Sequence, residues 1–464
     1  MPALLTTVVG GLVAVCAFVV LSRIYLSPIR HIPGPGFAAV TRFWYVRRLL
    51  KGKINLDILA AHDRYGHFVR IAPNEVSVGH PDGPRKILLA TLHKAEWYKI
   101  ATFPDARFYN TFAETNPKAK MELTKRIAPG YTMSNLLQSE QAIDSNLALL
   151  LDWLDRFAES GDSILLGDYL RYTTNDIVGD VLFSRPFGFL KKGADIGGTL
   201  ANAEVQIAYV SVMGFFRWAH VLLLANPVMT WLNMPFEDRQ KNPDGRYDVS
   251  AHWFRTLAES EKNNSNKTPS PGGRPMQRHE IDSAAFNAIS AATDTVAATI
   301  QAFMFYLMRH PEFRARALAE LADAGLLGAD GTESCLGFPR LAPKGGITIG
   351  DQTFPEGTTL SVHPWVIHLS LEIWGEDARE FNPDRWLGED AARLEKHFIP
   401  FSLGYGSCPG QNLGRIELSK ICATLLRNYD FSQVDPNQQM KYEAYFGLTA
   451  HIPPCYVKKQ NLGL

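Results

Sequence analysis

The N-terminal stretch constrains this 464-residue chain more than any other part of it. From Ala3 to Leu21 it reads ALLTTVVGGLVAVCAFVVL, with no charged side chain. A run of this length can cross the hydrocarbon core of a bilayer, where a single segment satisfies its backbone N–H and C=O groups only as a helix. The sequence therefore predicts one N-terminal transmembrane helix.

The residues around this run favour a retained anchor over a cleaved signal. A secretory signal begins with basic residues and ends at a small-residue cleavage site, whereas here no Lys or Arg precedes the run and Arg23 follows it. Further basic residues continue to Lys53, so the positive-inside rule places the rest of the chain in the cytosol. We expect residues 1–30 to form the anchor and its flank.

The segment HIPGPG, residues 31–36, separates the anchor from the main body. Its two prolines end a helix and its two glycines permit a sharp change of direction, so we expect a hinge here and one domain over residues 37–464. Apolar spacing in that domain is mostly helical, with long helices expected over 281–309 and from 411 to about 427. Strand character is confined to short stretches such as 68–72 and 339–362, which predicts a mainly α fold with a small β region.

Charge and cysteine usage exclude several classes of function. The chain has 47 basic and 47 acidic residues and a pI near 7.2, so no field attracts nucleic acid. Its cysteines lack CxxC spacing, which argues against a disulfide framework and a structural zinc site. They are Cys16, Cys335, Cys408, Cys422 and Cys455.

The apolar segment from Val205 to Trp231 has two interpretations. It could form two core helices, or a surface that dips into the bilayer beside the anchor. Because Arg217, His220 and Pro227 interrupt any continuous span, we expect core helices.

One cysteine lies in a glycine-rich loop just before a helical pattern. The loop FSLGYGSCPG, residues 401–410, places Cys408 near backbone N–H groups and the positive end of a helix dipole, both of which favour a thiolate. A thiolate suits a nucleophile or a metal ligand. The ligand interpretation explains the glycines, which keep side chains away from a flat macrocycle, and gives Phe401 the task of covering the sulfur. A buried structural cysteine is the alternative.

These residues carry a family resemblance. Phe401, Gly404, Cys408 and Gly410 fit the haem-binding pattern FxxGxxxCxG of the cytochrome P-450 family, and the chain resembles its fungal membrane-bound members over nearly its whole length. The supporting segments are HIPGPG, WYKI (97–100), FAETNPK (112–118), PKGG (343–346), VHPWVIH (362–368), FNPDRWL (381–387) and QNLGRIELSKICA (411–423).

The resemblance implies the cytochrome P-450 fold, with haem b held by Cys408 as axial thiolate. A thiolate pushes electron density into the iron and favours O–O cleavage. Such an enzyme inserts one oxygen atom from O2 into an apolar small molecule, here in fungal secondary metabolism, with electrons from an NADPH-dependent cytochrome P-450 reductase. It would be a single-pass protein of the endoplasmic reticulum membrane with a cytosolic catalytic domain.

The resemblance also assigns a task to the middle of the long helix at 281–309. The stretch AATDTV, residues 291–296, takes the place of the family's acid and alcohol motif, so Asp294 and Thr295 would supply protons during oxygen activation. The alternative is that Thr295 bonds back to its own helix and Asp294 is solvated on a surface.

Two departures from the family pattern stand out. Glu333 begins the best match to the ExxR motif but Leu336 stands where arginine belongs, so a block is missing and Arg385, its usual ion-pair partner, faces an incomplete network. A degenerate, non-catalytic haem- or ligand-binding relative is therefore the alternative function. For the haem propionates, Arg340 ranks first among the basic candidates. The others are Lys125, Arg126 and His363.

Overall fold

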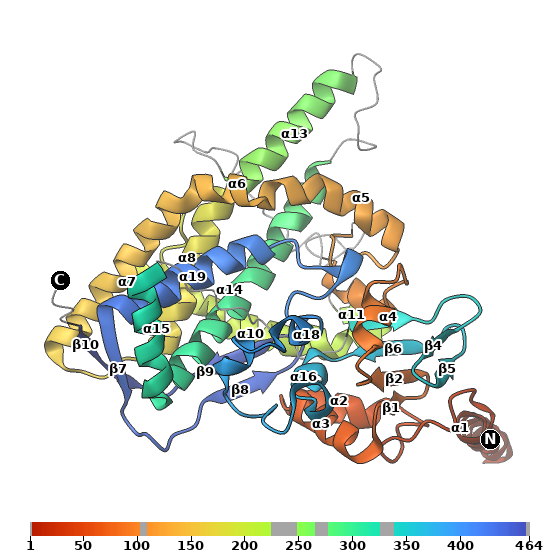
Figure 1. Ribbon diagram of the computed structural model, residues 1–464. Coiled ribbons are helices and arrows are strands. Elements are labelled where there is room, and N and C mark those ends of the chain that lie inside the picture. The colour runs from red at the N-terminus through yellow and green to blue at the C-terminus, as the bar shows by residue number, and fades with distance from the viewer. Residues whose placement is uncertain (1, 103–108, 224–247, 265–276, 325–337, 461–464) are drawn as a thin grey trace. The chain divides into compact units, whose positions relative to one another are not determined.

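The computed structural model describes residues 2–102, 109–223, 248–264, 277–324 and 338–460. The chain forms two compact units (Figure 1). The first unit comprises residues 1–95 and 334–399, and the second comprises residues 96–333 and 400–464. Glu333 and Leu336, the predicted remnant of the ExxR motif, lie outside the described residues.

The N-terminal run is helical, as predicted. Helix α1 spans Pro2–Leu21 and continues into the π-helical turn η1, Ser22–Leu26, with exposed apolar side chains along its length. By length and composition, three described helical stretches could cross a membrane: Leu4–Leu26, Ile196–Leu222 and Arg278–Arg309. The most apolar window of the first stretch contains no buried residue, so this stretch is the candidate membrane anchor.

The first unit is built on a four-stranded sheet of order β1-β2-β6-β3. Strands β1 (Phe68–Ala72) and β2 (Glu75–Val78) form an antiparallel hairpin, β2 runs parallel to β6 (Thr359–Val362), and β6 pairs antiparallel with β3 (Phe338–Leu341). A second ribbon joins β4 and β5. The remaining elements are α2 (Phe43–Leu49), α3 (Ile54–Tyr65), α4 (Gly83–Leu88), β4 (Ile347–Ile349), β5 (Gln352–Phe354), α16 (Pro364–His368), α17 (Leu371–Trp374), η7 (Pro383–Trp386) and α18 (Ala391–Glu395).

The segment between the anchor and this sheet is attached to strand β1. The Arg70 N–H donates to the Pro33 carbonyl oxygen over 2.7 Å. A Cβ at Gly34 would overlap the Arg70 carbonyl, so only glycine allows the two backbones this approach. The side chain of Arg70 donates to the Arg23 carbonyl and to the Ser27 hydroxyl, which fixes the flank of the anchor.

The second unit is mostly helical and surrounds one long helix, α14 (Arg278–Arg309) (Figure 1). Helix α14 packs against α8 (Leu166–Phe183), α19 (Gln411–Asn428) and strand β9 (Leu448–His451). The core of the second unit is formed by apolar side chains of these helices and of α7 (Glu140–Ser160). The other elements are η2 (Glu96–Ala101), α5 (Pro117–Ile127), η3 (Ala128–Tyr131), α6 (Met133–Leu136), η4 (Leu137–Ser139), α9 (Phe189–Lys192), η5 (Ile196–Gly198), α10 (Thr199–Met213), η6 (Gly214–Phe216), α11 (Arg217–Leu223), α13 (Val249–Asn264), α15 (Pro311–Ala324), η8 (Gly404–Gly406), β7 (Tyr429–Gln433), β8 (Lys441–Ala444) and β10 (Cys455–Lys459).

The mainly α fold with a small β region is confirmed, and element boundaries follow local signals. Helix α14 begins with a reciprocal capping box between Gln277 and Glu280 and ends at Arg309, just before Pro311 starts α15. Helix α19 follows Gly410 and ends one residue after the predicted Arg427.

The expectation that the apolar segment from Val205 forms core helices is wrong over its described part. Val205 is 69% exposed in α10, and Trp218 and Leu222 are each 70% exposed in α11. Helix α10 fully buries only Leu200 and Ser211, because one face alone packs on the protein. Hydropathy shows that a face is apolar but not what covers it, and an exposed apolar face of this kind is typical of a contact surface.

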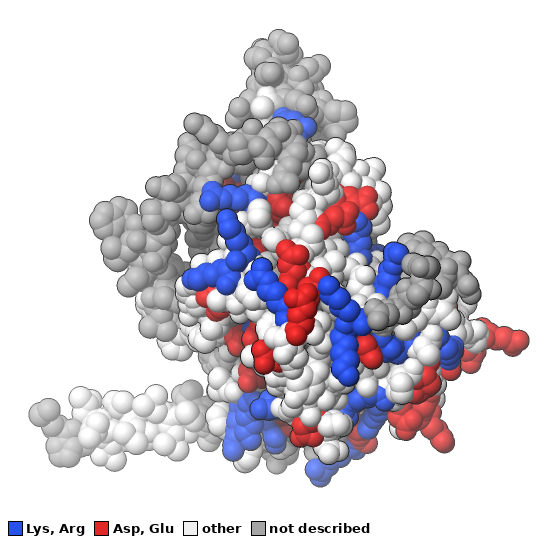
Figure 2. Space-filling model, turned by 90° about the vertical axis from the view of Figure 1, so that its left-hand side faces the viewer, with Lys and Arg blue, Asp and Glu red and all other residues white. Residues whose placement is uncertain are grey.

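Charges of both signs are mixed over the side of the second unit formed by α7, α15, β7 and β10 (Figure 2). Lys459 pairs with Asp155 at 2.8 Å and Arg314 pairs with Asp430 at 3.2 Å. Such exposed pairs contribute little stability, but they leave no single-sign field on this face.

A polarised hydrogen-bond chain crosses the interior of the first unit. Tyr45 O–H faces His363 Nε2 at 3.4 Å, His363 Nδ1 and the Ser77 hydroxyl lie 3.0 Å apart, and Ser77 and His62 Nε2 lie 2.7 Å apart. The chain ends where His62 Nδ1 donates to the Gly66 carbonyl oxygen over 2.9 Å. Each donor therefore meets an acceptor when both imidazoles are neutral. Burial keeps them neutral, because it lowers the pKa of His62 to about 4 and that of His363 to about 3.

We expect Ser77→Ala to destabilise the protein, because it leaves one imidazole donor and one acceptor buried without partners. Each such group costs roughly 1–3 kcal/mol. The measurement is urea unfolding at pH 7.5, with Ser432→Ala on the exposed side of β7 as control. Equal urea midpoints of unfolding for the two variants would show that this hydrogen-bond chain does not stabilise the protein.

A single carboxyl group lies in the core of the second unit without a compensating contact. Glu417 of α19 is fully buried, and neither of its carboxyl oxygens has a hydrogen-bond partner among the described residues. Burial raises the pKa of Glu417 well above its ordinary value of 4.5, so the folded chain keeps a proton there that the unfolded chain releases. Stability from this group is therefore complete below pH 4.5 and is lost as the pH rises.

We expect Glu417→Gln to remove that pH dependence. The difference in unfolding free energy between variant and wild type should grow in the variant's favour between pH 5 and pH 8, by up to about 1.4 kcal/mol per pH unit. Denaturant unfolding at several pH values measures it. A difference that is constant across this range would show that Glu417 is ionised in the folded protein.

Candidate functional site

The Cys408 loop folds tightly between η8 and α19. Cys408 N–H donates to the Phe401 carbonyl oxygen over 2.9 Å, and Ser407 N–H donates to the Gly404 carbonyl over 3.0 Å. Gly404 has a φ of 61° and Ser402 a φ of 58°, so the loop turns in the left-handed region. These turns present the thiol at the start of α19, as the sequence predicts.

Opposing influences act on the Cys408 thiol. The side chain is solvent-accessible, but protein atoms surround its sulfur closely enough that desolvation raises its pKa. The Gly410 N–H donates toward the sulfur and Lys120 lies near it, and both of these act to lower the pKa of the thiol. Desolvation is the largest of these influences, so the pKa of the Cys408 thiol is raised overall, contrary to the thiolate that the loop and the helix dipole predict from the sequence.

The sequence analysis did not identify Lys120, a basic residue that contacts this loop. Lys120 of α5 is 5% exposed, and its ammonium group donates to the Tyr405 carbonyl oxygen inside the loop. It also lies 5.3 Å from the centre of the Tyr405 ring. Spacing alone had directed attention to Lys125, five residues further along the same helix, which is exposed and pairs with Glu122. Tertiary structure distinguishes them, because Lys120 is held by a loop 285 residues further along the chain.

Helix α14 holds the predicted proton-supplying pair in two different environments. Asp294 is 8% exposed and pairs with Arg171 of α8, with 3.3 Å between Asp294 Oδ1 and Arg171 Nε. Arg171 also pairs with Glu204 of α10 at 2.7 Å. A solvated Asp294, part of the alternative interpretation, is therefore wrong. The other part holds, because the Thr295 hydroxyl donates to the Ala291 carbonyl over 2.9 Å.

The packing of α14 on α19 places the residue after this pair close to the Cys408 loop. A Cβ on Gly414, in the first turns of α19, would lie 3.8 Å from Val296, the residue after Thr295, and 4.0 Å from the Phe401 ring. The Phe401 ring also lies 5.4 Å from the guanidinium of Arg415. Two motifs that are far apart in the sequence thus lie against the same part of α19.

The candidates for propionate contacts separate clearly. His363 belongs to the neutral hydrogen-bond chain of the first unit, and Arg126 lies 3.5 Å from the carboxylate of Glu280. Arg340 is 1% exposed in β3, where its Nη1 donates to the Pro339 carbonyl over 3.1 Å. A buried guanidinium suits an anionic partner better than the neutral His363 or the exposed Lys125 does.

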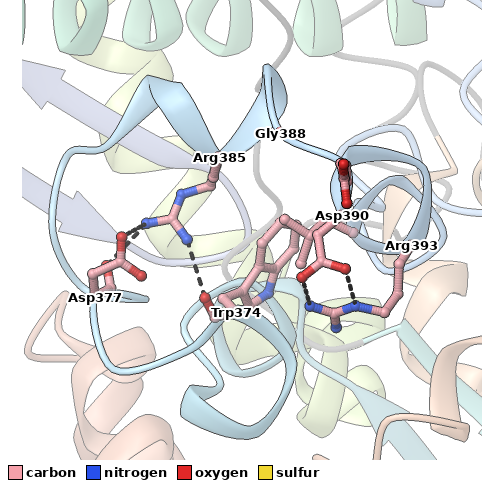
Figure 3. Close-up of a pocket in the computed structure, with 8 residues that line it drawn as sticks. Trp374, Asp377, Arg385, Gly388, Asp390 and Arg393 are labelled. Carbon is pink, nitrogen blue, oxygen red and sulfur yellow. Dashed lines mark hydrogen bonds and ion pairs between the residues drawn. The ribbon is translucent and has the colours of Figure 1, made fainter.

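Arg385 has a partner, contrary to the expectation of an incomplete network. It lies 3.2 Å from the carboxylate of Asp377 and donates to the carbonyl oxygens of Asp377 and Trp374 (Figure 3). It also donates to the carbonyl oxygen of Asn382. Local carboxylate and carbonyl groups therefore compensate the guanidinium within the first unit, so no uncompensated charge remains at Arg385.

Arg385 also lines a cavity of about 440 Å³ (Figure 3). The lining residues are Trp374, Asp377, Arg385, Gly388, Glu389, Asp390, Arg393 and Leu394. Asp390 accepts from Arg393 at 3.1 Å, which lowers the pKa of that carboxyl group. A wall so rich in charge does not suit an apolar ligand, and we do not assign substrate to this cavity.

Aromatic side chains gather in a part of the second unit that suits an apolar ligand better. Phe446 lies 5.3 Å from Trp97 and 4.9 Å from Phe112, measured between ring centres. Its N–H donates to the Ser211 hydroxyl of α10 over 2.8 Å. Residues from three distant segments, one of them beside the exposed apolar helices, thus form one aromatic wall.

The donor set fits haem better than a bare ion. The described residues contain no group of three or more His, Cys, Asp and Glu side chains placed to hold a metal. A porphyrin supplies the equatorial ligands itself, so one cysteine thiolate is enough to hold its iron. Cys408, with a donor at Gly410 and a positive charge at Lys120, meets that requirement.

Comparisons with known proteins identify the family of this chain. The sequence profile of the cytochrome P450 family matches residues 33–325 and 334–458. The cytochrome P450 monooxygenase asR2 of Sarocladium schorii is 29% identical, with 90% of each chain covered. The cytochrome P450 monooxygenase mpaDE of Penicillium roqueforti is 30% identical over 90% of this chain and 54% of its own length.

Pisatin demethylase of Fusarium vanettenii is 26% identical over 91% of this chain and 87% of its own length. The family profile and these relatives each cover most of the chain. The chain therefore belongs to the cytochrome P450 family, as an oxidoreductase of the monooxygenase type that has a haem-thiolate iron cofactor and uses a redox partner and a small-molecule substrate.

Proposed function

We propose that the chain inserts one oxygen atom from O2 into an apolar small molecule of fungal secondary metabolism, with haem b as cofactor. The observation that carries this is the Cys408 loop, which presents one thiol beside an N–H donor and a buried ammonium group. Haem bound there supplies oxygen activation, which the thiolate promotes by donating electron density. In this proposal Phe401 covers the sulfur side and Arg340 binds a propionate.

Asp294 and Thr295 then handle protons. Arg171 holds Asp294 in the interior as one of two carboxylates on a single guanidinium, so the acid has a counter-charge without exposure to bulk water. The Thr295 hydroxyl donates its own proton to the Ala291 carbonyl, which leaves its oxygen lone pairs to accept a hydrogen bond from a reacting group or a water. Such a pair can pass protons one at a time.

The aromatic wall around Phe446 is the proposed substrate contact. Trp97, Phe112 and Phe446 offer apolar area with few hydrogen-bonding groups, which favours an apolar molecule. Several relatives are fungal proteins named as cytochrome P450 monooxygenases, which supports fungal secondary metabolism as the setting.

The proposed cellular arrangement follows from the N-terminal segment. Residues 1–30 anchor the chain once in the endoplasmic reticulum membrane, residues 31–36 connect, and residues 37–464 form the monooxygenase domain on the cytosolic side. The uncharged run from Ala3 to Leu21 and the basic residues that follow it, beginning with Arg23, support this orientation. NADPH-dependent cytochrome P450 reductase is the proposed electron donor.

Replacing Cys408 tests the cofactor assignment. We expect Cys408→Ala to abolish the red-shifted Soret band of the reduced carbon monoxide complex, because no other group replaces the thiolate. The full chain is measured in microsomal membranes, with Cys16→Ala in the anchor as control. A native band in Cys408→Ala would defeat the proposal. A native band in the wild type without oxygen-dependent NADPH consumption would favour a non-catalytic haem protein.

Replacing Thr295 tests the proton path. We expect Thr295→Ala to bind haem normally but to convert a larger share of consumed NADPH into hydrogen peroxide, with product formation lowered by about tenfold or more. Thr299→Ala is the matched control, because its hydroxyl makes the same type of bond to the Thr295 carbonyl one turn along. The same peroxide share in both variants would remove Thr295 from the path.

A further inference from the structure

Lys120 is a buried lysine. It is 5% exposed, whereas Lys118 and Lys125 on the same helix reach solvent. Burying an ammonium group is costly unless hydrogen bonds and charge compensate it. The contacts of Lys120 with the Cys408 loop are its hydrogen bond to the Tyr405 carbonyl and its approach to the Tyr405 ring.

The loop itself leaves the Tyr405 carbonyl oxygen for this lysine. Its internal bonds use the carbonyls of Phe401, Leu403 and Gly404, which accept from Cys408, Gly406 and Ser407 respectively. The Tyr405 carbonyl is not used by these turns and accepts from Lys120 instead. Helix α5 is thereby attached to the turn that directs Cys408, through one side chain.

The same ammonium group acts on the sulfur electrostatically. Its hydrogen bond to the Tyr405 carbonyl oxygen places a positive charge in the loop, three residues before Cys408. In a low-dielectric surrounding, a nearby cation stabilises electron density on the sulfur and reduces what the sulfur donates to a bound iron. Weaker donation favours the ferrous over the ferric state.

We propose that Lys120 is a positioning residue for Cys408: it fixes the turn before the thiol through the Tyr405 carbonyl oxygen and, by its charge, raises the reduction potential of the haem that Cys408 holds. The inference rests on the proposed function, since it requires haem on Cys408. Lys120 touches neither substrate nor reacting atoms in this role.

Lys120→Gln separates charge from positioning, because glutamine keeps an N–H donor for the Tyr405 carbonyl and removes the charge. We expect the full-length variant to bind haem with a thiolate band, but to show about a tenfold lower ferrous-to-ferric ratio at a fixed ambient potential, equivalent to about 59 mV. Lys120→Arg should return the ratio to within about twofold of wild type. Lys118→Gln removes the same charge from an exposed position on the same helix and should leave the ratio unchanged.

The outcomes divide cleanly. A wild-type ratio in haem-loaded Lys120→Gln, or an equal shift in Lys118→Gln, overturns the inference. If Lys120→Gln fails to hold haem, Lys120→Arg decides: a native band and ratio support the inference, and loss of haem there as well overturns it. A wild type without a thiolate band contradicts the proposed function itself, which is visible before any variant is compared.

Discussion

The presentation of one sulfur atom at the start of α19 is the constraint on which the functional part of this molecule depends. A thiol on a flexible loop could not hold a flat cofactor in one orientation. Here backbone bonds close the loop on itself from Phe401 to Cys408, Gly404 supplies a left-handed turn, and Lys120 joins the loop to α5. The packing of Val296 on Gly414 then brings the acid and alcohol of α14 to the same helix.

Short-range contacts compensate several buried charges in both units. Asp294 meets Arg171, Arg385 meets Asp377, and Lys120 meets a carbonyl oxygen and an aromatic ring. Glu417 differs, because its carboxyl has no hydrogen-bond partner among the described residues and is kept neutral by burial. The ionised pairs hold their side chains in fixed orientations. The carboxyl of Glu417 is tolerated in the core only while it stays protonated.

Several features could be predicted from the sequence because their causes are local. The uncharged run predicted helix α1, the Pro311 break predicted the end of α14, and the glycines around Cys408 predicted a tight loop at a helix start. The environments of side chains were less accessible. Exposure of Trp218, the inward orientation of Lys120 and the Asp377 partner of Arg385 all depend on contacts between segments, which periodicity does not encode.

The sequence by itself determined the family, the mainly α architecture and the candidate membrane anchor, and it singled out Cys408 as the proposed iron ligand, since each follows from residue types at fixed spacing. Tertiary structure alone decided which charges are buried and what compensates them. Asp294 and Lys125 are both ordinary charged residues on helices, yet one is paired in the interior and the other is exposed. The physical reason is that the free energy of a charge depends on the atoms packed around it.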